Sequence, residues 1–268
     1  MTQSSASSAR RKTALVSGAS SGIGLELARL LAQDGYGLVL VARRREKLAQ
    51  VAAELEGAHA IRATVLPRDL SRPEAPDEVF EALQADSVAV DVLVNSAGFG
   101  LYGRFGEIDT AAACDLLRVN IVALTHLTRR FLPGMVERGA GRILNVASLA
   151  AFMPGPMMAT YHASKAYVLR LSAALAEELR GSGVTVTALC PGYVRTGFED
   201  RSGLRMDEVR LSRLGVMDAA AVARAGYRGM MRGRRVVVPG LVSKLLVLGV
   251  KIGPRNLVTR IAHWLQTG

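Results

Sequence analysis

Short apolar runs alternate with longer amphipathic stretches along most of the chain. Several runs are apolar at consecutive positions, which is typical of strands buried on both faces. These runs predict strands at residues 13–17, 38–41, 63–66, 90–95, 142–148, 184–190 and 235–239. The longer stretches predict helices at residues 24–34, 44–56, 73–85, 109–138 and 160–180. This alternation predicts a single α/β domain built on a doubly wound parallel sheet.

Residues 241–268 depart from this alternation and predict an amphipathic helical extension. Its first part is largely apolar, but it is interrupted by Lys244 and is too short to cross a bilayer. A second helix begins at Pro254, and its apolar stripe consists of Leu257, Val258, Ile261, Trp264 and Leu265. The chain therefore divides into a polar tail (residues 1–12), a domain (13–240) and basic amphipathic C-terminal helices (241–268).

The composition is typical of a globular protein with a large core and excludes a fold held by disulfides or by zinc. The chain has 268 residues, half of them hydrophobic, which is enough to bury a large core without disulfides or metals. Two cysteines, Cys114 and Cys190, cannot form a disulfide framework or a four-ligand zinc site, and we expect no metal. Because no export signal is visible near the first residue, we expect a cytoplasmic protein.

The net charge of +11 belongs to the C-terminal quarter. Residues 1–200 carry 21 Lys+Arg and 20 Asp+Glu, a net of +1, whereas residues 201–268 carry 13 and 3, a net of +10. This basic segment has neither a zinc-finger spacing nor aromatic residues interleaved with basic ones. We therefore expect no nucleic acid as a partner.

A glycine-rich turn joins the first predicted strand to the first predicted helix, with Gly18, Gly22 and Gly24 spaced as G-x-x-x-G-x-G. Glycines at such a turn let the backbone approach a pyrophosphate, to which the helix N-terminus offers amide donors. The second predicted strand is followed by Arg43 and Arg44, where an NAD-binding domain carries an acidic residue. Guanidinium groups can pair with a 2′-phosphate, which favours NADP. Alternatively, these arginines are the solvated start of the next helix.

Tyr161 and Lys165 are four residues apart, on one face of a predicted helix. Ser148 ends a predicted strand at the carboxyl edge, where open α/β sheets bind their ligands. A phenol has a pKa of about 10, and a neighbouring ammonium group favours its ionised form. We therefore expect Lys165, together with the positive ring of an oxidised nicotinamide, to favour the phenolate and move the pKa of Tyr161 towards a usable value. His162 points about 100° away from Tyr161, and we expect it to be structural or exposed to solvent.

In combination these motifs resemble those of the short-chain dehydrogenase/reductase family, in its NADP-preferring type with a Rossmann fold, over residues 13–239. The resemblance implies a catalytic tetrad of Asn120, Ser148, Tyr161 and Lys165. The cofactor-binding residues that it and the preceding arguments predict are Gly18, Ser20, Ser21, Gly22, Ile23, Gly24, Arg43, Arg44, Asp69, Leu70, Asn95, Ala97, Gly98, Tyr161, Lys165, Pro191, Gly192, Val194 and Thr196. Ser17 and Ser96 depart from the family's usual Thr and Asn.

The resemblance implies an NADP-dependent oxidoreductase that interconverts a carbonyl and a secondary alcohol, and we expect mainly reduction. Tyr161 would give its proton to the carbonyl oxygen, Ser148 would hydrogen-bond that oxygen, and Asn120 would hold a water that connects Lys165 to solvent. The expected substrate-binding residues are Ser148, Phe99, Phe152, Met153 and Tyr193, with a substrate loop at residues 192–216. Their apolar character favours a lipophilic ketone or a 3-oxoacyl group.

Several alternatives remain open at this point. The chain could be a catalytically silent NADP-binding scaffold, or a membrane-surface adaptor acting through its tail. The tail itself could cover the substrate cleft or a subunit interface, attach peripherally to an anionic membrane, or bind an acidic acyl carrier partner. The resemblance also implies a homodimer or homotetramer packed through residues 109–138 and 160–180.

Overall fold

Seven strands form the central sheet of the computed structural model, which describes residues 11–195 and 215–267. All the pairings between neighbours in this sheet are parallel, in the order β3-β2-β1-β4-β5-β6-β9. The strands are β1 (Thr13–Ser17), β2 (Gly37–Ala42), β3 (Ala63–Pro67), β4 (Val92–Asn95), β5 (Gly141–Val146), β6 (Val184–Leu189) and β9 (Val236–Val237). The chain order reverses between β1 and β4, so the predicted doubly wound sheet is confirmed.

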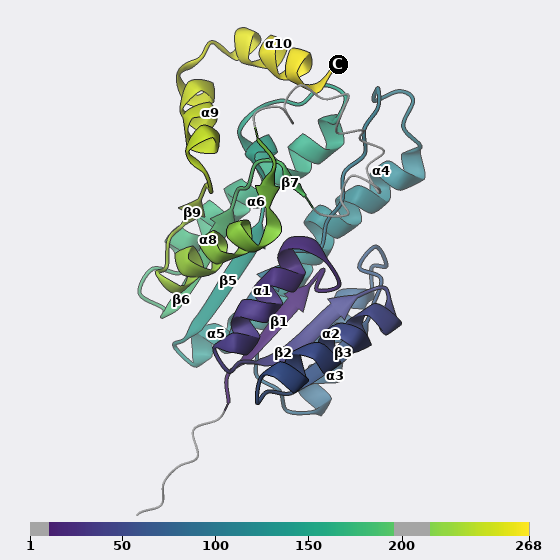
Figure 1. Ribbon diagram of the computed structural model, residues 1–268, viewed down its shortest axis with the longest axis vertical. Helices are drawn as coiled ribbons and strands as arrows, with labels where there is room; N and C mark the ends of the chain where they lie inside the picture. The colour runs from purple at the N-terminus through teal and green to yellow at the C-terminus, as the bar shows by residue number, and fades with distance from the viewer. Residues whose placement is uncertain (1–10, 196–214, 268) are drawn as a thin grey trace, which may run out of the picture.

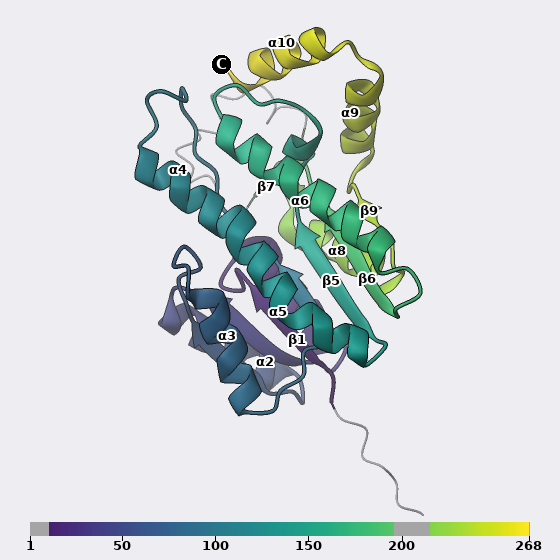
Figure 2. The same cartoon turned by 180° about the vertical axis from the view of Figure 1, so that it is seen from behind.

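Helices cover both faces of this sheet (Figures 1 and 2). One layer contains α1 (Gly22–Gln33), α2 (Arg45–Ala58) and α8 (Ala219–Met231). The other contains α3 (Ala75–Ala85), α5 (Leu124–Glu137) and α6 (Ala159–Glu178). The remaining elements are α4 (Thr110–Leu117), the π-helical η1 (Arg118–Ala123), the 3-10 helix η2 (Leu149–Phe152), the pair β7 (Val194–Arg195) and β8 (Met217–Asp218), α9 (Leu241–Ile252) and α10 (Arg255–Gln266).

The two helical layers explain why the strands are apolar at consecutive positions. In β1, Ala14 and Val16 pack into the core beneath α1 and α2, whereas Leu15 packs into the core beneath α3 and α5. In β2, Leu38 and Val39 divide in the same way. Because side chains of a strand alternate between faces, both sets of positions must be apolar.

The structure departs from the sequence prediction in a few elements. The helix predicted at 109–138 is continuous but contains η1, and α8 was not predicted. The continuous helix Thr110–Glu137 is long and apolar enough to cross a membrane by composition. However, Leu127 and Met135 are fully buried in the core against the sheet, as expected of a helix of this fold.

The C-terminal helices α9 and α10 lie above the carboxyl end of the sheet (Figures 1 and 2). Tyr102 fastens the end of α10, because its hydroxyl donates a hydrogen bond to the carbonyl oxygen of Gln266 at 2.8 Å. The C-terminal extension is therefore attached to the carboxyl end of the domain.

Candidate active site

The turn after β1 is folded so tightly that side chains are excluded at two of its glycines. Gly18 has a φ of +71°, and a Cβ there would lie 2.8 Å from the backbone nitrogen of Ala97. A Cβ on Gly24 would collide with the carbonyl group of Gly18. At the N-terminus of α1, the Ser21 side chain makes no capping hydrogen bond. The first amides of α1 therefore face the cavity without a side-chain cap, a geometry that fits a pyrophosphate.

Arg43 and Arg44 follow β2, and both line the same cavity as the glycine turn. Both side chains are exposed, and within the described part of the chain neither guanidinium group is engaged in an ion pair. Arg44 is the N-cap of α2. Cations at this end oppose the helix dipole, and an anionic ligand at the cavity would compensate them.

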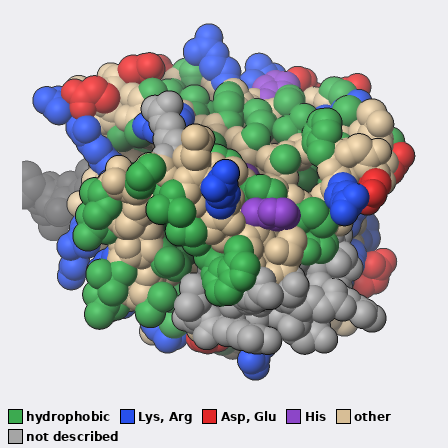
Figure 3. Space-filling view, turned by 90° about the horizontal axis from the view of Figure 1, so that it is seen from above, with side chains coloured by type: hydrophobic (Ala, Val, Ile, Leu, Met, Phe, Trp, Pro, Cys, Tyr) green, Lys and Arg blue, Asp and Glu red, His purple; other side chains and the backbone are tan. Residues whose placement is uncertain are grey.

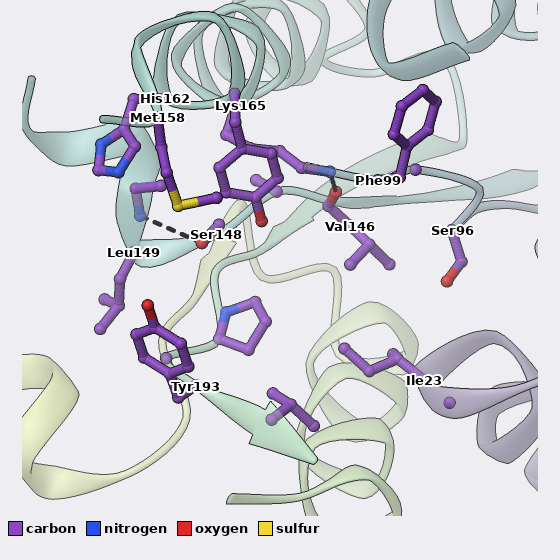
Figure 4. A pocket seen from close by; sticks show the side chains of 18 of the residues that line it. Ile23, Ser96, Phe99, Val146, Ser148, Leu149, Met158, His162, Lys165 and Tyr193 are labelled. Atoms are coloured by element: carbon purple, nitrogen blue, oxygen red, sulfur yellow. Dashed lines mark hydrogen bonds between the residues drawn. The ribbon is translucent and has the colours of Figure 1, made fainter. Parts of the chain in front are cut away.

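Ser148, Tyr161 and Lys165 line the cavity, and Figure 4 shows Ser148 and Lys165 on its wall. Ser148 lies two residues after Val146, the last residue of β5. Its Oγ accepts a hydrogen bond from the backbone amide of Ala150 at 3.1 Å. Lys165 lies one turn beyond Tyr161 on α6, with its Nζ 5.7 Å from the centre of the Tyr161 ring. The carbonyl oxygen of Val146 holds this ammonium group at 2.9 Å.

Burial controls the electrostatics of these groups. It raises the pKa of Tyr161 to about 12, while a hydrogen bond with the Ser148 side chain acts in the opposite direction. Burial also lowers the pKa of Lys165 to about 8. The expected lowering of the Tyr161 pKa is therefore not found in the chain by itself, since desolvation penalises the phenolate more than its neighbours stabilise it. At neutral pH the phenol is protonated, which is the form that can donate a proton.

Asn120 lies on η1, where it contacts α6, the helix that carries Tyr161 and Lys165. Its Oδ1 accepts from the amide of Phe99 at 3.1 Å, and its Nδ2 donates to the carbonyl oxygen of Phe99 and to Ser164 Oγ, both at 3.0 Å. A Cβ on Gly98 would lie 3.0 Å from Asn120 Oδ1 and 3.3 Å from Lys165 Nζ, so both side chains approach the space that the missing Gly98 side chain leaves open. Asn120 thus fixes the loop after β4, and a water held between it and Lys165 stays a prediction.

Two of the predicted site residues, Asn95 and Phe152, lie away from the cavity wall, and the prediction for Thr196 is not tested. The Asn95 side chain is buried below the cavity, where its Nδ2 donates to Asn145 Oδ1 at 2.9 Å and to Thr128 Oγ1 at 3.1 Å, so it braces neighbouring elements of the core. Phe152 is absent from the cavity wall, because it packs against the buried cluster around Val168. Thr196 lies outside the described residues.

The other predicted residues surround a single cavity of about 1610 Å³. They are Gly18, Ser20, Ser21, Gly22, Ile23, Gly24, Arg43, Arg44, Asp69, Leu70, Ala97, Gly98, Phe99, Ser148, Met153, Tyr161, Lys165, Pro191, Gly192, Tyr193 and Val194. Beyond Ser148, the wall is largely apolar and is completed by Met158 and by residues of α9 and α10 such as Leu246 and Leu265. The C-terminal helices therefore cover part of the cleft, as one of the sequence interpretations predicted.

His162 and Gln266 line the cavity without having been predicted to do so. His162 is buried, and its Nδ1 lies 2.9 Å from the carbonyl oxygen of Met153. Because that carbonyl can only accept, Nδ1 carries the proton, and Nε2 accepts from the Gln266 amide nitrogen at 2.7 Å. Burial lowers the pKa of His162, which keeps the ring neutral. Gln266 Oε1 is buried and has no hydrogen-bond partner within the described ranges.

The buried face of α10 is not the apolar stripe that its sequence predicts, so hydrophobicity did not identify Gln266. Val258, Ala262 and Gln266 recur at every fourth position and form the buried face of α10. The stripe that we predicted from hydrophobicity lies mostly beside this face: Leu257, Ile261 and Trp264 are between 47% and 57% exposed.

Comparisons with known proteins agree with this geometry. A family model described as short chain dehydrogenase matches residues 12–206. Ketoacyl reductase HetN from Nostoc sp. is 32% identical over 261 residues, which cover 94% of this chain and 88% of that protein. A short-chain dehydrogenase from Sphingobium yanoikuyae in complex with NADPH shares 35% identity with a TM-score of 0.79, and the match covers 86% of this chain and 88% of the other.

A second solved structure bears on the cofactor. The short chain dehydrogenase/reductase from Burkholderia phymatum in complex with NAD shares 28% identity with a TM-score of 0.79, and the match covers 90% of this chain and 92% of the other. Both nicotinamide cofactors are therefore represented among similar structures.

Proposed function

The chain belongs to the short-chain dehydrogenase/reductase family, and from this premise we propose that it is an NADPH-dependent reductase of lipophilic ketones or 3-oxoacyl groups. Membership of the family makes it an oxidoreductase that uses a nicotinamide cofactor. The observation that carries the finer proposal is one cavity that joins a glycine turn, two exposed arginines, a buried Ser-Tyr-Lys group and an apolar far wall.

The residues of this chain fit the cofactor. The glycine turn and the N-terminus of α1 would hold the pyrophosphate, and Arg43 with Arg44 would pair with the 2′-phosphate of NADPH. When bound, the cofactor supplies the hydride that reduces the carbonyl carbon. The choice of NADPH over NADH rests on these arginines, since similar structures contain either cofactor.

The protein groups then act on the carbonyl oxygen. Ser148 Oγ would hydrogen-bond this oxygen and stabilise the negative charge that develops on it. Tyr161, protonated at neutral pH, would donate its proton to the same oxygen, which yields the alcohol. Lys165 is fixed by Val146 beside the phenol, where its positive charge would stabilise the phenolate left after proton transfer. The low solvent access of both groups strengthens this interaction.

The apolar wall supports a lipophilic substrate. Phe99, Met153, Met158 and Tyr193 line the cavity, and none of them carries a charge that would bind a sugar phosphate or a carboxylate. The relative HetN is named a ketoacyl reductase, which favours the same chemical class.

Assembly into a homodimer or homotetramer belongs to the same proposal. Val122, Val136 and Tyr167 are each at least 38% exposed along the continuous helix Thr110–Glu137 and α6, the surfaces through which we expect subunits to pack. Light scattering of the purified protein tests this, and a monomeric mass at micromolar concentration would contradict it.

The function is tested by following NADPH oxidation with a substrate panel. The panel should contain long-chain ketones, 3-oxoacyl thioesters, short ketones and sugars, with NADH as the alternative reductant. We expect turnover with the first two classes and a preference for NADPH. If the protein binds NADPH but oxidises it with none of them, it is a catalytically silent scaffold and the proposal is wrong.

A further inference from the structure

The two C-terminal helices each direct an apolar stripe away from the protein core. On α9, Leu245 is 59% exposed, and Ile252 is 78% exposed. On α10, Trp264 is 57% exposed. The opposite faces are the buried ones, with Val247 on α9 and Ala262 on α10. Large aliphatic and aromatic side chains are therefore left facing outward on consecutive helices.

The charged side chains that α9 and α10 place beside these stripes are cations, as far as the described residues show. Lys244 and Lys251 are exposed on one edge of α9, and Arg260 is exposed next to the stripe of α10. In the sequence, no Asp or Glu follows Asp218. A helix with an apolar stripe, flanking Lys or Arg and no acidic residue is typical of segments that lie in the interface of an anionic membrane.

The outward stripes are continuous with the mouth of the cavity. Leu241, Leu245, Leu257 and Ile261 are exposed and also line the cavity. Leu248, Ile252 and Trp264 are exposed without lining it. Figure 3 looks onto this end of the molecule, where hydrophobic side chains gather with interspersed Lys and Arg, while acidic side chains lie towards the margins.

We propose that α9 and α10 form a membrane-docking surface that seats this end of the protein on an anionic lipid bilayer. This docking surface consists of Leu241, Leu245, Leu248, Ile252, Leu257, Ile261 and Trp264, flanked by Lys244, Lys251 and Arg260. The apolar residues enter the boundary between headgroups and acyl chains, and the cations meet the headgroups. The cavity mouth then opens towards lipid. Docking itself does not depend on the proposed function. The further consequence, that a lipophilic substrate enters the cavity from the bilayer, does rest on it.

The charge distribution favours a bilayer over a second copy of the chain. A symmetric contact through α9 and α10 would bring Lys244, Lys251 and Arg260 of both copies together without a carboxylate from either helix. An acidic carrier protein would match the charge but would not require the exposed Leu248, Ile252 and Trp264.

Trp264 provides a direct readout, because it is the only tryptophan in the chain. Full-length protein is mixed at low salt with vesicles of phosphatidylcholine alone or of phosphatidylcholine with phosphatidylglycerol. We expect co-sedimentation with the anionic vesicles only, a blue shift of Trp264 emission on binding, and release at high salt. If the protein stays in the supernatant and the emission is unchanged, the proposal is wrong.

Matched variants separate docking from general charge and folding effects. Lys244→Glu with Lys251→Glu should lower the vesicle partition coefficient at least about tenfold, whereas Lys47→Glu on α2 should not. Leu248→Glu with Ile252→Glu should reduce the vesicle partition coefficient similarly, whereas Val236→Glu at an exposed position of β9 should not. Equal effects of the surface variants and their controls would overturn the proposal.

Two further measurements keep this proposal separate from the function. A shift of Trp264 emission with protein concentration in the absence of lipid would mean that a second copy covers the surface, and the membrane proposal would be wrong. None of the four α9 substitutions lies on the cavity wall, so NADPH oxidation with a water-soluble ketone should be retained. Loss of vesicle binding with retained turnover is the expected result.

Discussion

Gly18→Ala offers the sharpest test of the cofactor turn, because Gly35→Ala serves as its matched control. Both glycines have positive φ angles, +71° and +79°, that L residues adopt at a cost. The two sites differ in the atoms that a Cβ would meet. A Cβ at Gly18 would lie 2.8 Å from Ala97 N and 2.9 Å from Ala97 Cα, whereas a Cβ at Gly35 has no heavy atom within 4 Å.

The expected magnitudes follow from this difference. Backbone strain, partly offset by the lower entropy of the unfolded chain, makes Gly35→Ala destabilising by about 1 kcal/mol. Gly18→Ala carries the same strain and in addition overpacks against backbone atoms that cannot rotate away, which costs about 1–3 kcal/mol more. Because the turn must open to admit the methyl group, we also expect NADPH binding to weaken at least about tenfold in Gly18→Ala alone.

Urea unfolding monitored by circular dichroism, together with NADPH titration, measures both effects. Unchanged m-values would show that the two variants unfold from comparable states to comparable ensembles. The argument fails if Gly18→Ala is no less stable than Gly35→Ala, or if it binds NADPH as the unmodified chain does.

The remaining predictions concern the reacting groups, the cofactor and the substrate end. Tyr161→Phe should bind NADPH almost normally but keep less than about a tenth of kcat, since only the transferable proton is lost; retained turnover in NADPH oxidation would remove Tyr161 as the donor. Arg43→Asp should weaken NADPH binding by roughly 2–3 kcal/mol and leave NADH binding unchanged. Arg45 lies outside the cavity wall, so Arg45→Asp should leave NADPH binding unchanged; calorimetric titration of both variants tests this. The pKa of Lys165 is lowered to about 8, so the folded protein releases this proton before the unfolded chain does. Relative to Lys165→Met, the unfolding free energy should therefore rise by about 3 kcal/mol from pH 8 to the unfolded pKa of 10.5, and a pH-independent difference in urea unfolding would contradict this. Gln266→Ala should raise KM for the carbonyl substrate severalfold with little change in NADPH affinity, and an unchanged KM would exclude Gln266 from the substrate end.

The sheet was predictable because its strands are constrained on both faces. Leu15 and Val16 are adjacent and both fully buried, one in each layer of the core, and no surface strand would require this. The glycine turn was predictable for a related reason, since its position at the end of β1 fixes where a helix N-terminus must point. Local pattern and global topology agree at these positions.

Hydrophobic periodicity predicts the buried face of a helix less well where the helix departs from α-helical geometry. Asn120 lies on η1, a π-helical turn within an otherwise α-helical run, and the wider turn alters which residues share a face. The raised pKa of Tyr161 was also beyond the sequence, because it arises from burial. Burial depends on chain segments distant in sequence that close around the phenol.

The orientation of α10 shows why amphipathic pattern and burial need not coincide. The pattern identifies the apolar side of a helix, but a helix is oriented by the partners that each side finds. The Gln266 side chain is turned inward because its amide nitrogen donates to His162, and Tyr102 donates to the backbone carbonyl oxygen of the same residue. These two hydrogen bonds fix the end of α10 over the cavity and leave Ile261 and Trp264 facing outward. An apolar stripe that a soluble domain would ordinarily bury is therefore displayed at the cavity mouth, where a lipid surface can satisfy it.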